Sequence, residues 1–163
     1  MRKIKQLFLG LVVLISGTAC FAKQLSVQIV QHDGTQEKII NQSYVIEDEL
    51  LNGFFDKGFI VTTSPAATSD STNQDEILVK TGLLDAKDGQ SDYFIQVRLY
   101  FLQDKSGADK YDGLIRMDWS IYSVATGKLV KESSFNQLKK LRIEKDLKTV
   151  SNDLLAELYK VVK

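Results

Sequence analysis

The sequence contains a single cysteine, a single histidine and a single proline among its 163 residues. One cysteine cannot form a disulfide bond within the chain, so the fold depends on a hydrophobic core. One histidine excludes a zinc site built from several histidines. The main apolar stretch, residues 7–15, is well short of the ~20 residues that cross a bilayer as a helix.

That stretch has the flanks of a secretory signal peptide. Three basic residues and no acidic residue precede it, and the small residues 16–19 follow it. This is the order of the basic, apolar and cleavage regions of a signal peptide. The sequence therefore predicts a signal peptide over residues 1–22 and a single domain over residues 23–163, which is periplasmic or secreted.

Two cleavage sites are open, and they differ in what happens to Cys20. Cleavage after Ala22 leaves small residues at the −3 and −1 positions, removes the cysteine and releases a free protein. Cleavage before Cys20 makes it the lipidated first residue of an outer-membrane lipoprotein. Gly17 stands where lipoproteins usually carry an aliphatic residue, which favours the first alternative.

The net charge argues against some classes of partner. The chain has 21 basic and 21 acidic residues, and three of the basic ones belong to the signal peptide. The mature domain keeps 18 basic against 21 acidic residues, a net charge of −3. A mildly acidic domain has no electrostatic preference for nucleic acid or anionic lipid. We therefore expect no nucleic-acid partner, and a membrane contact only if Cys20 is lipidated.

The spacing of apolar residues predicts the order β-α-β-α-β-β-β-α. The strands are expected over 25–30, 59–63, 93–101, 114–124 and 128–135, and the helices over 41–57, 75–86 and 143–162. This order predicts one α/β domain with a mixed five-stranded sheet, in which a parallel βαβ unit joins an antiparallel meander and helices pack on the sheet. Residues 64–74 hold the only proline and no large apolar side chain, so they are expected to form a mobile surface loop.

Individual residues predict local features of the helices. Asn41 is expected to cap the first helix, and Gly58 to end it in the left-handed conformation. Ile77 and Leu84 are among the apolar positions of the second helix.

Candidate catalytic and metal-binding residues are few. His32 is interpreted as part of a polar turn, because no matching nucleophile lies near it. Asp85, Asp88 and Asp92 lack the alternating ligands and closing glutamate of a calcium loop. No serine stands in a nucleophile elbow, and no glycine-rich phosphate loop occurs. The sequence predicts no catalytic residue, no cofactor and no metal, and hence a protein that is not an enzyme.

The predicted meander concentrates aromatic residues. Trp119 shares one strand face with apolar neighbours and is expected in the core. The opposite faces of two strands carry Arg98 and Tyr100, and Arg116 and Tyr122. Tyrosine and arginine are enriched in binding hot spots. If no helix covers them, these four residues are the candidate binding surface.

Short motifs resemble a family of exported envelope domains. They are a glycine-to-strand step at 58–61 (GFIV), a small-Asp-aromatic strand start at 91–97 (SDYFIQV) and a Thr-Gly hairpin within 123–130 (SVATGKLV). The chain is similar in these motifs to curli-secretion lipoproteins, penicillin-binding-protein activator lipoproteins and the amino-terminal domain of the translocation protein TolB. The resemblance covers residues 25–162 in element order and implies a non-enzymatic envelope protein that binds another protein.

Two functional hypotheses follow. The first is an exported bacterial envelope protein that binds an envelope protein partner as an assembly or regulatory factor. The second is a periplasmic module that binds a small ligand or a cell-wall polymer, which requires a concave pocket with converging polar groups.

Mass spectrometry of the mature protein distinguishes the two cleavage sites. We expect a chain that begins at Lys23 and carries no lipid. A mature chain that begins with an acylated Cys20 would show instead that the protein is a lipoprotein.

Overall fold

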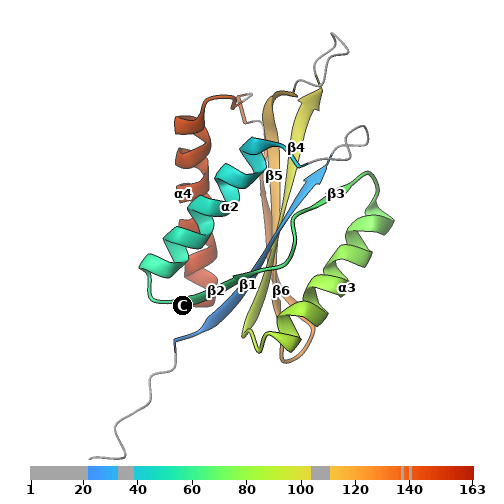
Figure 1. Ribbon diagram of the computed structural model, residues 1–163, viewed down its shortest axis with the longest axis vertical. Coiled ribbons are helices and arrows are strands. Elements are labelled where there is room, and N and C mark those ends of the chain that lie inside the picture. Colours follow the sequence, from blue (N-terminus) through green and yellow to red (C-terminus); the bar gives the residue numbers. More distant parts are fainter. Residues whose placement is uncertain (1–21, 33–38, 104–110, 137, 140) are drawn as a thin grey trace, which may run out of the picture.

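The computed structural model describes residues 22–32, 39–103, 111–136, 138–139 and 141–163, which form one α/β domain (Figure 1). The elements in chain order are β1 (Gln24–His32), α2 (Asn41–Asp56), β2 (Ile60–Thr63), β3 (Ala67–Ser69), α3 (Thr72–Asp88), β4 (Tyr93–Gln103), β5 (Tyr111–Ser123), β6 (Lys128–Phe135) and α4 (Glu144–Val162). None of the helices in this described part has the length and apolar character needed to span a bilayer. The predicted signal peptide lies outside it except for Ala22, and so does Cys20.

The sheet joins a parallel half to an antiparallel half, as predicted. Strand β1 pairs in parallel with β4 along one edge, and with β2 and then β3 along the other. Strands β4, β5 and β6 form the antiparallel meander. The α/β fold with a βαβ unit and a meander is confirmed, and the sheet has six strands rather than five.

The prediction of a surface loop over residues 64–74 was wrong. This segment contains β3 and the first turn of α3, which begins at Thr72. Only backbone groups are needed to pair β3 with β1, so the absence of large apolar side chains does not prevent a strand. Ser71 caps α3 by accepting a hydrogen bond from the amide of Gln74 at 3.4 Å.

One face of the sheet, here called the apolar face, is covered by α2 and α4 (Figure 1). Alternate side chains of the central strands point into this layer and are completely buried, among them Val27, Val97 and Ile121. Trp119 is 2% exposed there, as predicted. Each such side chain contributes about 1.5–3 kcal/mol when fully buried. The apolar face therefore supplies most of the stability that a chain without disulfide bonds requires.

Backbone and polar contacts fix the ends of α2. The N-cap residue is Ile40 and not Asn41, and no side chain of its own caps the helix. Instead, the buried Gln31 of β1 accepts hydrogen bonds from the Ile40 amide at 2.9 Å and the Ser43 hydroxyl at 3.0 Å. The prediction for Gly58 is confirmed: its φ is +85°, and its amide donates to Phe55 O. This is the glycine-ended helix terminus that needs a left-handed residue.

The opposite face of the sheet, here called the polar face, carries α3 (Figure 1). Few side chains hold this helix: its buried residues are Asp75, Gly82 and Ala86. Ile77 and Leu84, which the sequence placed among its apolar positions, are 52% and 62% exposed. Small residues bring α3 close to the strands, and a Cβ built at Gly82 would lie 2.3 Å from Cζ of Phe94.

Gly82→Ala tests this close approach. Phe94 is fully buried, so its ring cannot move aside, and overpacking costs about 1–3 kcal/mol. The ~1 kcal/mol that alanine gains over glycine in a helix offsets only part of that cost. We expect a lower free energy of unfolding in urea, whereas Thr81→Ala, at the exposed neighbouring position, leaves it unchanged or slightly raised. Equal stability of the two variants would contradict the packing of α3 on Phe94.

Candidate functional site

Beneath α3, the polar face buries side chains that are hydrogen-bonded to one another. Gln96 of β4 donates through Nε2 to Oε1 of Gln28 on β1 at 3.0 Å, and Ser26 Oγ lies 3.5 Å from Ser64 Oγ. All four residues are at most 3% exposed. Buried polar groups cost free energy unless they are paired. These hydrogen bonds therefore favour one register of the neighbouring strands, but burying this layer adds little stability by itself.

At one end of this layer, His32 and Asp75 form the contact that holds the first turn of α3. His32 Nε2 lies 2.8 and 2.9 Å from the two carboxylate oxygens of Asp75. Arg98 Nη1 lies 3.5 Å from the same carboxylate. A carboxylate oxygen accepts this hydrogen bond when Nε2 carries the ring proton. His32 is therefore the last residue of β1 and contacts α3, while the rest of the polar turn expected there, residues 33–35, lies outside the described residues.

Tyr100 lies between an imidazole and a guanidinium group. The His32 ring stacks on its ring with centroids 4.5 Å apart, and Arg116 lies over it with Cζ 4.8 Å from the centroid. Arg116 is held in place by Asp118, two residues along β5, which accepts from its Nε at 2.7 Å and also from Nη2. Burial, followed by the nearby Asp118, raises the pKa of Tyr100, and the arginines oppose that rise.

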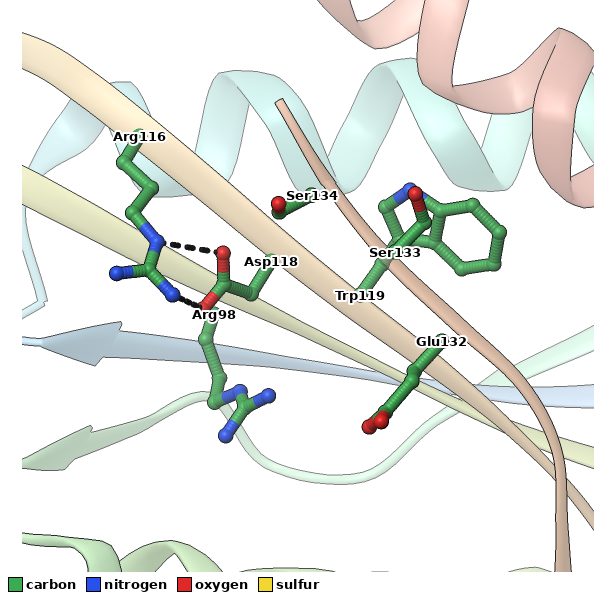
Figure 2. A pocket seen from close by; sticks show the side chains of 7 residues that line it. All are labelled: Arg98, Arg116, Asp118, Trp119, Glu132, Ser133 and Ser134. Carbon is green, nitrogen blue, oxygen red and sulfur yellow. Dashed lines mark hydrogen bonds and ion pairs between the residues drawn. The ribbon is translucent and has the colours of Figure 1, made fainter. Parts of the chain in front are cut away.

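A cavity of about 280 Å³ opens beside this stack (Figure 2). Its lining residues are Arg98, Arg116, Asp118, Trp119, Glu132, Ser133 and Ser134. Figure 2 shows the paired Arg116 and Asp118 on one side and Glu132 on another. The cavity thus presents cationic hydrogen-bond donors and anionic acceptors to a ligand or to a partner's side chains.

One polar atom next to the cavity has no partner. Among the described residues, Nε of Arg98 is buried and makes no hydrogen bond. A buried donor left unpaired costs about 1–3 kcal/mol. Metal binding has no such support, because no group of three or more histidine, cysteine, aspartate or glutamate side chains in the described residues is placed to hold an ion.

The structure brings together three of the four residues of the predicted surface. Arg98, Tyr100 and Arg116 form one cluster, in which Arg116 is 49% exposed and Arg98 24%. Tyr122 lies apart, six residues along β5, or about 20 Å at the rise of a strand, and its ring packs against Phe94 with centroids 6.1 Å apart.

The cluster also contains His32 and Asp75, which sequence reasoning did not place there. Asp118 was not among the four candidate residues, but period-two alternation does place it on the same strand face as Arg116. His32 and Asp75 are 43 positions apart and belong to different elements. No local pattern links them.

The fold and this cluster define a single-domain α/β protein with helices on both faces of a mixed sheet and a charged site on its polar face. A family model described as "Uncharacterised protein" matches residues 24–163, and the chain belongs to that family. Among curated protein sequences, none matches the chain.

Solved structures of similar fold are distant in sequence. A PelC dodecamer from Paraburkholderia phytofirmans is 15% identical, with 84% of this chain and 85% of that chain covered and a TM-score of 0.47. The LpoB C-terminal domain from Salmonella enterica is 12% identical, with 77% and 91% covered and a TM-score of 0.41. Lipoprotein GNA1162 from Neisseria meningitidis is 8% identical, with 86% and 99% covered and a TM-score of 0.42. A likeness at this distance carries no argument about function.

Asp75→Ala tests whether the His32–Asp75 contact holds α3. The variant leaves His32 and Arg98 without their shared carboxylate, and hydrogen bonds to charged groups contribute about 1.5–3 kcal/mol each. We expect a loss of that size in the free energy of unfolding, together with faster amide hydrogen exchange in the first turns of α3. Asp85→Ala, which removes an exposed carboxylate from the same helix, is the control and should change neither. Unaltered exchange in Asp75→Ala would mean that other contacts hold the helix.

Proposed function

We propose that the mature chain is an exported bacterial envelope protein that binds another protein, as a non-enzymatic assembly or regulatory factor. Export rests on the signal peptide that the sequence predicts over residues 1–22. Protein binding rests on the polar face, where α3 leaves the β5 and β6 side of the sheet open. We assign no catalytic role to the charged cluster.

The observation that carries the proposal is the stack of Arg116 on Tyr100, at the edge of the part of the polar face that α3 leaves uncovered. Arg116 is half exposed, yet its guanidinium is fixed by Asp118 and by the ring beneath it. A pre-ordered arginine loses little side-chain entropy when a partner binds. Arginine and tyrosine beside a concave pocket are the usual composition of a binding hot spot. The pocket would then receive a side chain of the partner.

Site-specific crosslinking in the cell envelope tests the proposal. A photoreactive amino acid at Ser134, on the rim of the pocket, should give a discrete protein adduct. The same group at Asn152, exposed on α4 and remote from the polar face, should not. Arg116→Ala should reduce the adduct at position 134 about tenfold or more, as expected for the loss of a hot-spot residue.

Folding must be separated from binding in this experiment. Glu132→Lys reverses a charge on the pocket wall at an exposed position and should weaken the adduct without changing the melting temperature. Recovery of no adduct from any position around the pocket would remove the main support for a protein partner.

The cavity also favours a second candidate function, binding of a cell-wall polymer or a small ligand. Its guanidinium and carboxylate groups converge on about 280 Å³, a volume slightly below that of common ligand pockets. This candidate requires saturable binding of the purified domain to cell-wall material that is free of protein, lost in Arg116→Ala. Binding of that kind without any crosslinked protein would favour the second candidate over the first.

A further inference from the structure

A second concave surface lies between α3 and the turn that joins β5 to β6. This groove has a volume of about 450 Å³ and is lined by the second half of α3 and residues 124–127. Leu83, Leu84 and Val124 make its floor and walls apolar. Leu84 is 62% exposed, an unusual state for a side chain on a helix that packs against a sheet. The apolar surface is left open by the fold of one chain.

The rim of the groove is positively charged. Lys80 and Lys87, one on each side of Leu84 along α3, line it, and no acidic residue of the described chain does so. Lys128 follows directly after the turn. Apolar walls with a basic rim suit an occupant that carries large apolar side chains flanked by carboxylates.

The outer surface of α2 has that chemistry. Tyr44, Asp48 and Phe55 are spaced by four and seven residues, which places them within about 40° of one another around the helix. Tyr44 and Phe55 are 46% and 72% exposed. We call these three residues the α2 stripe.

The charges around the stripe are acidic. Helix α2 contains four acidic residues and neither lysine nor arginine. Burial, and then the neighbouring Asp48, raises the pKa of Glu47. Lys57, just beyond the helix, is directed to the Tyr159 ring with Nζ 4.8 Å from its centroid.

The two surfaces lie on opposite sides of the molecule. Helix α2 covers the apolar face of the sheet, and α3 lies on the polar face (Figure 1). A groove cannot therefore receive the stripe of its own chain. Two grooves facing each other would oppose lysines to lysines, and two stripes would oppose acids to acids. Of these three pairings, the contact between the stripe of one copy and the groove of another is the one that joins complementary surfaces.

We propose that this chain associates with itself head to tail, with the α2 stripe of one copy seated in the α3 groove of the next. Phe55 and Tyr44 supply the apolar anchors, and Asp48 with the neighbouring Glu47 faces Lys80 and Lys87. Such a heterologous contact repeats from copy to copy and produces a closed ring or an open filament. The contact uses neither Arg116 nor the pocket beside it, so it is independent of the proposed partner-binding function.

Two variants of the mature domain test the contact. The groove variant, Lys80→Glu with Lys87→Glu, reverses the rim charges. The stripe variant, Asp48→Asn with Phe55→Ser, removes one apolar anchor and one carboxylate charge, and it adds no charge that could pair with the reversed rim of the groove variant. All four positions are exposed, so we expect unchanged melting temperatures. In sedimentation experiments the unaltered domain should have at least twice the monomer mass, and each variant should be a monomer.

A mixture of the two variants gives the sharpest result. The groove variant keeps its stripe and the stripe variant keeps its groove, so one productive contact forms and no further copy can be added. We expect a dimer with one copy of each variant. Continued monomers in the mixture would overturn the head-to-tail contact, as would an unaltered domain that stays monomeric up to millimolar concentration.

A matched control and a competing occupant complete the experiment. Lys139→Glu with Lys145→Glu changes the net charge by the same amount as the groove variant does. Both positions are exposed and lie outside the two surfaces, so association should persist. Vesicles of phosphatidylglycerol present the other anionic, apolar surface that could cover the groove. A monomeric domain that binds these vesicles through Lys80 and Lys87 would overturn self-association and assign the groove to lipid.

Discussion

The polar face of this protein depends on one carboxylate. Helix α3 buries little apolar surface, and Asp75 is the group that ties its first turn to His32 and Arg98. A side chain that is 9% exposed pays for its desolvation only when its partners are close. The position of α3, and with it the boundary between the covered and the open part of the polar face, follows from this contact together with the packing of Gly82 on Phe94. The pocket and the groove both lie along that boundary.

The two faces of the sheet contribute differently to stability, because one carries apolar side chains and the other polar and charged ones. The apolar face is filled by α2 and α4 and contains the side chains whose burial stabilises the chain. Lys148 of α4 adds ion pairs to Glu49 of α2 and to Glu144, but exposed pairs of this kind contribute little. The polar face gains less from burial and is free to hold charged groups near the surface. Charged residues placed there do not compete with the core.

The sequence predicted what local patterns encode. Alternation placed Trp119 in the core, and the regular spacing along α4 matches its buried side from Leu147 to Leu158. Strand β3 has no such pattern. It forms because its backbone pairs with the edge of β1, and this pairing needs no particular side chains. The candidate site was predicted in part: Arg98, Tyr100 and Arg116 follow from strand alternation. The meeting of His32 with Asp75 depends on the tertiary packing of α3, which no local spacing describes.

The apolar side chains that the fold leaves exposed are not distributed at random. Ile77 and Leu84 project from α3, and Tyr44 and Phe55 from α2, whereas the central strands β1, β4 and β5 leave no large apolar side chain of their described residues exposed; the edge strands expose Ile60, Leu129 and Val130. A helix needs only one side for packing on a sheet, so large apolar residues on the other side add nothing to the stability of a single chain. They also favour aggregation unless something covers them. The acidic charge around one set and the basic charge around the other make a second copy of the same chain the partner that covers both.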